Sequence, residues 1–193
     1  MRCILCEEIS FNIICKKCQN DFLESSFYKR ELANGFYIYS FYNFEEIKEL
    51  INTKYLFFGD KVFTILAKKA LYKFAQNFTY NNTVYAIPID DHTRHQFSQT
   101  AILAKSLKSK YIKPVYNTLT ATNVVKYAGK DLNFRQNNKR NFKYTGKQKI
   151  QVILIDDIVT SGTTILEARK VLEQNNCEVL FALSLCDVGV ISN

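Results

Sequence analysis

The sequence is poor in the residues that break or loosen a folded chain. Its 193 residues include only two prolines and six glycines, which excludes collagen-like and linker-rich architectures. Long hydrophobic runs are also missing, because no stretch reaches the ~18 uncharged apolar residues of a membrane span. The opening residues, Met1 to Cys3, lead into no apolar signal segment, so we expect no secretory signal, no membrane span and a cytoplasmic location.

The length and the apolar content predict a folded α/β protein of modest size. A chain of 193 residues has room for one domain of about 150 residues and a small appendage. Apolar residues make up 47% of the chain, which is enough for a sizeable core and argues against intrinsic disorder.

Acidic residues are scarce in one part of the chain. The formal net charge is +8, but residues 92–149 alone carry thirteen Lys or Arg against the single acid Asp131, a local balance of +12. Such a block favours a polyanionic partner such as nucleic acid or a phosphate-rich substrate. The alternative is a solvated surface with a mobile loop. The residues predicted to contact nucleic acid are Lys126, Lys130, Arg135, Lys139 and Arg140.

Four of the six cysteines form two C-x-x-C pairs within the first eighteen residues. Two such pairs can place four thiolates at the corners of a tetrahedron, which is the geometry of a structural Zn²⁺ site. Because a segment of this length has no core of its own, the metal would supply its folding free energy. Disulfides and free core thiols are the alternatives, and disulfides fit a reducing compartment poorly. The predicted zinc ligands are Cys3, Cys6, Cys15 and Cys18, and the predicted core thiols are Cys177 and Cys186.

The hydrophobic pattern alternates between strands and helices from residue 84 onward. This alternation predicts a parallel sheet. Residues 117–148 are polar and weakly periodic, and a loop of that length is usually functional or mobile. The predicted strands are 35–44, 84–89, 111–116, 152–155 and 177–185, and the predicted helices are 45–51, 60–78 with Asp60 as N-cap, 96–108 and 165–176.

One segment, QVILIDDIVTSGTT, combines a buried strand with two acids and a hydroxyl-rich turn into a helix. Parallel sheets place their ligands at the carboxyl ends of strands, where Asp156 and Asp157 stand. Gly162 permits an unusual backbone angle, and the N–H groups that open the next helix attract anions. The turn comprises Thr160, Ser161, Gly162, Thr163 and Thr164.

This arrangement suits a sugar phosphate. The turn would hold a phosphate while the two carboxylates accept hydrogen bonds from vicinal hydroxyls. The alternative is a simple helix cap, but a cap needs one hydroxyl and no adjacent acids. A P-loop is excluded, since G-x-x-x-x-G-K-[ST] is absent.

The segment VILIDDIVTSGTT resembles the phosphoribosyl-pyrophosphate (PRPP) signature of type I phosphoribosyltransferases, and the whole chain resembles the ComF/ComFC late-competence family. Two further stretches match that family in part. They are the HQFSQ run at residues 95–99 before Leu103 and Ala104, and the RQNN run at residues 135–138 before Phe142. The resemblance implies a four-Cys finger at 1–20, a connecting region at 21–80 and a parallel-sheet phosphoribosyltransferase-like domain at 81–193.

The resemblance also implies roles for individual residues. Asp156 and Asp157 would contact the ribose hydroxyls as the catalytic pair. Residues 160–164 would take the 5′-phosphate, and Mg²⁺ would bridge the ribose hydroxyls and the pyrophosphate. The pyrophosphate loop would lie near Ile89 and Asp90, with Arg94 as a further contact.

Three functions remain open from the sequence. The first is a competence protein that binds PRPP and handles incoming single-stranded DNA, together with competence-machinery proteins at the inner face of the membrane. The second is a salvage enzyme that transfers ribose 5-phosphate from PRPP to a nucleobase. The third is a redox or regulatory zinc module with an inactive pocket. Whether PRPP is turned over is not decided by the sequence.

Overall fold

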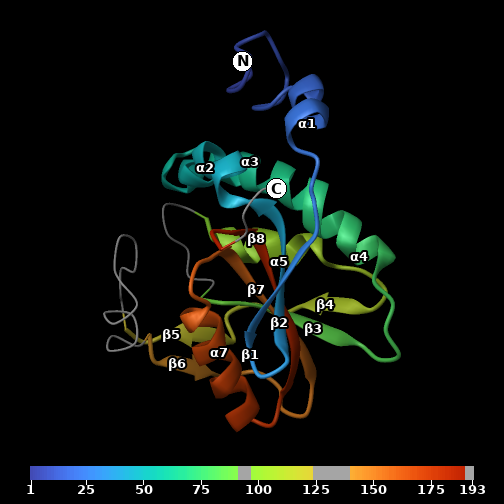
Figure 1. The fold of residues 1–193 in the computed structure, drawn as a ribbon, viewed down its shortest axis with the longest axis vertical. Coiled ribbons are helices and arrows are strands. Elements are labelled where there is room, and N and C mark those ends of the chain that lie inside the picture. The colour runs from blue at the N-terminus through green and yellow to red at the C-terminus, as the bar shows by residue number, and fades with distance from the viewer. Residues whose placement is uncertain (91–96, 124–139, 190–193) are drawn as a thin grey trace.

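A six-stranded sheet forms the centre of the protein (Figure 1). The computed structural model describes residues 1–90, 97–123 and 140–189. The strand order is β1-β2-β8-β7-β3-β4, in which β1 pairs antiparallel with β2 and all other pairs are parallel. The predicted α/β fold with a parallel sheet is confirmed. The strands are β1 (Tyr28–Ala33), β2 (Phe36–Asn43), β3 (Val84–Pro88), β4 (Ile112–Pro114), β7 (Gln151–Val159) and β8 (Glu178–Asp187).

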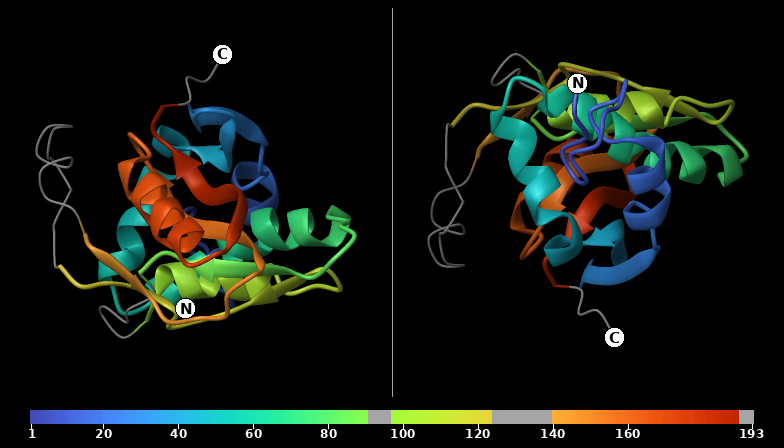
Figure 2. Two further views of the ribbon diagram at one scale, coloured as in Figure 1. Left: turned by 90° about the horizontal axis from the view of Figure 1, so that it is seen from below. Right: turned by 90° about the horizontal axis from the view of Figure 1, so that it is seen from above.

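Helices cover both faces of this sheet, as the views in Figure 2 show. One face carries α7 (Thr163–Gln174) and a small antiparallel pair, β5 (Leu119–Ala121) and β6 (Phe142–Tyr144). The other face carries the longer helical layer. That layer comprises α2 (Phe44–Asn52), the 3₁₀ turn η1 (Thr53–Tyr55), α3 (Gly59–Ala67), the π turn η2 (Lys68–Tyr72), α4 (Lys73–Asn77) and α5 (Gln99–Ser106).

Side-chain alternation along the strands divides the core into two clusters. On β7, Ile153 and Ile155 pack with the α3 and α5 side, whereas Val152 and Leu154 pack with α7. A strand buried on both faces reads as a continuous apolar run, which explains the VILI sequence. The same alternation continues into the two aspartates that follow.

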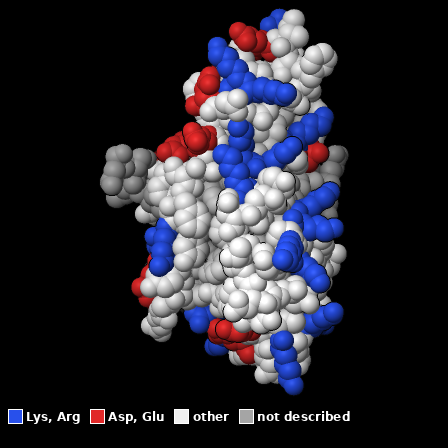
Figure 3. Space-filling view, turned by 90° about the vertical axis from the view of Figure 1, so that its right-hand side faces the viewer, with Lys and Arg blue, Asp and Glu red and all other residues white. Residues whose placement is uncertain are grey.

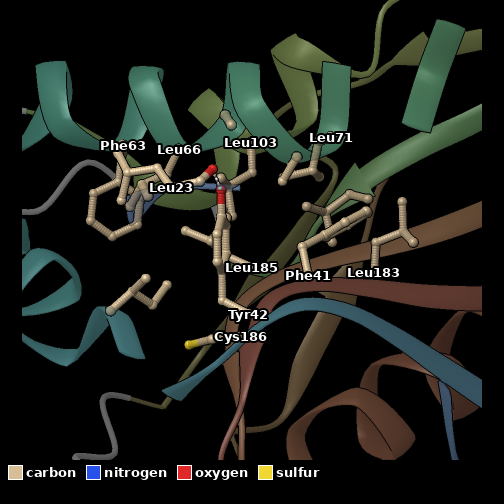
Figure 4. Packing of buried hydrophobic residues seen from close by; sticks show 14 of the residues in the cluster. Leu23, Phe41, Tyr42, Phe63, Leu66, Leu71, Leu103, Leu183, Leu185 and Cys186 are labelled. Carbon is tan, nitrogen blue, oxygen red and sulfur yellow. Dashed lines mark hydrogen bonds between the residues drawn. The ribbon is translucent and has the colours of Figure 1, made fainter. Parts of the chain in front are cut away.

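The first cluster also secures the N-terminal finger. Figure 4 shows Tyr42 of β2 among the leucines of α3 and α5, with its hydroxyl donating a hydrogen bond of 3.1 Å to the carbonyl oxygen of Leu23. Leu23 follows α1 (Lys16–Phe22), the short helix of the finger, and is itself buried. The predicted core positions of Cys177 and Cys186 are confirmed, since both are buried.

Several element boundaries differ from the sequence predictions. Helix α3 begins at Gly59 with Phe58 as its N-cap, so Asp60 lies in the first turn and the predicted N-cap was wrong. The predicted loop 117–148 contains β5 and β6. Strand β7 continues to Val159, because pairing with β8 extends it beyond the apolar run. In the described ranges, no helix has the length and apolar character needed to cross a bilayer.

Candidate functional site

The four N-terminal cysteines converge on one point. Their four sulfur atoms all lie within 4.8 Å of one another, and the Sγ atoms of Cys6 and Cys15 are 3.7 Å apart. Tetrahedral Zn–S bonds of about 2.3 Å would place neighbouring sulfurs roughly 3.8 Å apart. The cluster can therefore hold one metal ion with small adjustments of its thiols.

Backbone N–H groups point at the sulfurs of this cluster. The amide of Cys15 donates to Cys3 Sγ at 3.3 Å, and the amide of Cys18 donates to Cys15 Sγ at 3.4 Å. Burial opposes ionisation of Cys3, but backbone N–H groups lower the pKa of its thiol to about 6. Burial and the neighbouring thiols raise the pKa of Cys18. A cation at the centre would offset the charge of the remaining thiolates.

A second site lies where β7 runs into α7. Residues 160–164, here called the hydroxyl loop, form a small cradle together with Asp156 and Ile158. Gly162 has φ +79°, as the sequence predicted, and a Cβ there would lie 2.6 Å from the side chain of Leu32 on β1. The N-cap residue Gly162 has no side chain to cap α7, and the Thr163 amide donates a long bond of 3.5 Å to Ser161 Oγ, so the first turn of α7, which lines the cradle, keeps N–H groups for a ligand. Such N–H groups bind anions.

The hydroxyl loop is held in place by a half-buried arginine on the edge strand β1, which pairs with a buried aspartate. Arg30 of β1 donates to both carboxylate oxygens of Asp187 at 2.7 and 3.0 Å, and to the carbonyl oxygen of Thr160 at 2.8 Å. Only 1% of the Asp187 side chain is exposed. The antiparallel strand β1, which the sequence did not predict, therefore fixes the position of the loop through Arg30 and Leu32.

The two predicted aspartates are brought to the same end of the sheet but face opposite sides of it. Asp156 lines the cradle of the hydroxyl loop. The carboxylate of Asp157 instead accepts a bond of 3.2 Å from the ammonium of Lys54, which lies in η1 on the other face. Alternation along β7 imposes this division. The two carboxylates can therefore serve two different parts of a ligand.

The surroundings of these groups shift their ionisation. Burial, together with the neighbouring charge of Asp157, raises the pKa of Asp156 to about 8. Burial alone would lower the pKa of Lys54, but the negative charge of Asp157 raises it above the ordinary value. Lys54 is therefore cationic at neutral pH. Asp156 is largely protonated at neutral pH as long as no cation or ligand hydroxyl is bound to it.

The end of β3 forms the neighbouring wall. The amide of Ile89 donates to the carbonyl oxygen of Ile155 at 2.8 Å, which places Ile89 and Asp90 beside β7. The carboxylate of Asp90 is 3% exposed and accepts bonds of 3.2 Å from the Ala121 amide and from Arg140 Nη1. Asp90 and Arg140 therefore form part of the wall of the site.

Five of the predicted contacts lie outside the described residues. They are Arg94, Lys126, Lys130, Arg135 and Lys139. The structure adds two residues that sequence reasoning missed, Arg30 and Lys54. Neither stands in a recognisable motif, and each reaches the site only because its strand or turn packs against the end of β7 or β8.

A separate basic groove of about 920 Å³ runs between α5 and β4. Three lysines line it, Lys105, Lys108 and Lys113, and the partly exposed Tyr116 lines it as well. No acidic side chain is among the described residues that line this groove. Figure 3 views the side of the molecule that carries β3 and β4, where Lys and Arg gather with few acids among them.

The raised pKa of Asp156 makes a prediction about stability. Native Asp156 keeps its proton up to about pH 8, whereas an unfolded aspartate loses it near pH ~3.9. The native state thus binds more protons between these values, so this group's stabilising contribution falls as the pH rises through that window. We expect Asp156→Asn to be more stable than the parent at pH 8 and less pH-dependent in thermal melts. The exposed-site control Asp21→Asn should follow the parent, and equal slopes for all three proteins would refute the buried proton.

No protein-family model matches the chain, and no curated protein sequence matches it. Similar solved structures include a hypoxanthine phosphoribosyltransferase from Staphylococcus aureus, with 11% identity over 67% of this chain and 68% of that one and a TM-score of 0.40. An adenine phosphoribosyltransferase from Leishmania tarentolae shows 14% identity over 92% and 89% with a TM-score of 0.41, and an orotate phosphoribosyltransferase from Aeropyrum pernix 18% over 90% and 81% with 0.33. Because these identities and TM-scores are low, no statement about the site or the activity of this protein rests on the likeness.

Proposed function

We propose that the protein binds PRPP, or a related ribose 5-phosphate ligand, at the carboxyl end of β7. The observation that carries the proposal is the hydroxyl loop. It joins a central parallel strand to the N-terminus of α7, where the N-cap is a glycine, next to the carboxylate of Asp156. A 5′-phosphate fits the N–H groups and hydroxyls of the loop, and a ribose hydroxyl is within reach of a strand-end carboxylate. The resemblance of VILIDDIVTSGTT to the PRPP signature points to the same ligand.

The donors present also fit Mg²⁺. Carboxylate oxygens and substrate phosphates are the ligands that Mg²⁺ prefers, and Asp156 and Asp157 supply the carboxylates at this site. When bound, the ion would neutralise pyrophosphate charge. The chain's own share is to orient the sugar: Asp156 accepts from a ribose hydroxyl, and residues 160–164 hold the phosphate.

The double variant Asp156→Asn with Asp157→Asn tests this assignment. Losing two hydrogen bonds to charged groups should weaken PRPP binding by roughly 3–6 kcal/mol, at about 1.5–3 each. Calorimetry with PRPP and Mg²⁺ measures the effect, with Glu173→Gln as a control on the exposed side of α7. Unchanged affinity in the double variant would show that PRPP does not bind at this end of the sheet.

We further propose that the four-Cys finger holds one structural Zn²⁺. Four sulfur donors at tetrahedral spacing favour zinc over harder cations. Apart from the cysteines, Ile13 and Ile14 are the buried apolar side chains of residues 1–20, so the order of the loops that carry the cysteines should depend on the metal. In the proposed division of the chain, this finger (1–20) precedes a connecting region (21–80) and the phosphoribosyltransferase-like domain (81–193).

The zinc content of the purified protein tests this proposal. Elemental analysis should find about one zinc per chain in protein purified without chelator, and Cys3→Ser with Cys18→Ser should abolish it. Cys177→Ser serves as a control, because Cys177 is buried far along the chain from the finger. Metal-free wild-type protein with an intact finger by amide exchange would contradict the proposal.

The resemblance to late-competence proteins and the excess of basic residues lead us to propose single-stranded DNA as a partner. The groove between α5 and β4 offers three lysines and a partly exposed tyrosine, which suit phosphates and a stacked base. Lys126, Lys130, Arg135, Lys139 and Arg140 remain proposed contacts. Association with competence-machinery proteins at the inner membrane face rests on the resemblance alone.

Replacing the three groove lysines tests the DNA proposal. Lys105→Gln, Lys108→Gln and Lys113→Gln together should weaken binding of a labelled oligothymidylate. They should also flatten its salt dependence by up to about 0.7 per lost phosphate contact. Anisotropy titrations at two salt concentrations measure both quantities. A matched triple at exposed lysines outside the groove, Lys16, Lys48 and Lys73, is the control. If both triples behave alike, the groove does not bind DNA.

A nucleobase salvage enzyme is the second candidate. It is favoured by carboxylates on both sides of the strand end, with Asp156 in the cradle and Asp157 beside Lys54, which a pocket that only binds a phosphate does not require. Release of pyrophosphate from PRPP in the presence of one nucleobase would establish this activity.

A further inference from the structure

A cavity of about 400 Å³ lies between the β5–β6 pair and the β3–β4 edge of the sheet. Its walls include Tyr85 of β3 and Tyr144 of β6. Tyr85 pairs with Val152 of β7, which stands four residues before Asp156, roughly 13 Å along the strand. The cavity is therefore separate from the candidate ribose site. Among the described lining residues, it shares none with the lysine groove.

The walls of this cavity are held by contacts within the chain. The Tyr144 hydroxyl donates to the carbonyl oxygen of Lys147 at 2.6 Å, and the Thr145 amide donates to the carbonyl oxygen of Thr118 at 2.9 Å. A Cβ on Gly146 would lie 2.5 to 2.8 Å from the hydroxyl and ring of Tyr144, so the chain at Gly146 packs directly against that side chain. These contacts fix the shape of the cavity before any ligand binds, which lowers the cost of binding.

Most of the cavity surface is apolar. Val115, Ile150 and the two tyrosine rings supply this surface. Folded proteins leave few internal voids larger than a water molecule, whereas an apolar pocket of several hundred Å³ with a few polar groups is typical of a small-molecule site. The surface of the cavity therefore suits a flat ring, which can stack on tyrosine.

One polar group in the cavity wall lacks a partner. Thr118 lines the cavity, and in the described part of the chain its hydroxyl oxygen is buried and makes no hydrogen bond. Buried hydroxyls in folded proteins are nearly always hydrogen-bonded. A ring atom that carries an N–H or O–H group would supply the missing partner.

The charge on the cavity lining is positive. Lys147 is the one charged residue among the described residues that line the cavity, and it is exposed to solvent. An anionic group on a ligand would meet a complementary charge there. A cationic group would meet repulsion and no acidic partner among those residues.

We propose that this cavity binds a small aromatic acid. The ring contacts Tyr85 and Tyr144, a polar ring atom bonds to the Thr118 hydroxyl, and the carboxylate lies beside Lys147. The inference goes beyond the proposed function and depends on neither PRPP nor DNA, because the cavity is separate from the sites proposed for both.

The test uses the full-length protein and three probes that share one ring, namely indole-3-acetate, indole and tryptamine. They carry a negative charge, no charge and a positive charge. Calorimetry should rank their affinities in that order. Lys147→Gln should narrow the gap between the acid and the amine, each affinity changing up to about fivefold, as for an exposed charge pair. The matched control is Lys143→Gln, an exposed lysine of β6 outside the cavity lining.

Thr118→Val tests the contact inside the cavity. Valine has nearly the shape of threonine, so the fold should be retained while the hydroxyl is lost. Indole and indole-3-acetate should each bind roughly three- to tenfold more weakly, as expected for one lost hydrogen bond. Thr79→Val, at an exposed threonine, should leave both affinities unchanged.

Val115→Phe fills the cavity and should abolish binding of all three probes, with thermal melts to verify that the variant is folded. Absence of binding of any probe to the wild type would overturn the inference. Equal binding by the wild type and the folded Val115→Phe variant would also overturn it, because the probes would then be bound elsewhere. Tryptamine binding as tightly as indole-3-acetate would contradict the charge assignment. Self-association of the wild type that Val115→Phe abolishes, with no probe bound, would assign the cavity to contact with a second copy of the chain.

Discussion

The alternation of side chains along β7 is the constraint on which the candidate site depends. Because β7 is a central strand covered on both faces, its successive residues must enter opposite cores. Two consecutive acids at the end of such a strand cannot face the same way. Asp156 therefore belongs to the hydroxyl loop on the α7 side, and Asp157 to Lys54 on the α2 side. A ligand that contacts both must lie across the end of the strand.

Most of the acidic side chains around this strand end are paired with basic side chains. Asp90, Asp157 and Asp187 each accept a hydrogen bond from a basic side chain, whereas Asp156 accepts one from the Asp157 amide. The three paired acids therefore hold the walls and the loop in place. Asp156 is left with a raised pKa, and a bound cation or sugar hydroxyl would favour its charged form. Strained or shifted groups of this kind cluster where ligands bind.

Much of this architecture could be predicted from local sequence, and the reasons are physical. The VILI run, the glycine at 162 and the paired cysteines are local signals that act over a few residues, and the structure follows each of them. Strand β1 carries mixed polar and apolar residues at an edge, so its pattern did not identify it. Arg30 and Lys54 act over sequence separations of 157 and 103 residues, and no local pattern records such pairings.

A crystal structure of the protein with PRPP and Mg²⁺ would test the central claim most directly. The account predicts the 5′-phosphate on the backbone N–H groups of residues 160–164, with the ribose hydroxyls facing Asp156 and the sugar lying across the end of β7. Phosphates bound in the lysine groove between α5 and β4, with the hydroxyl loop empty, would contradict it.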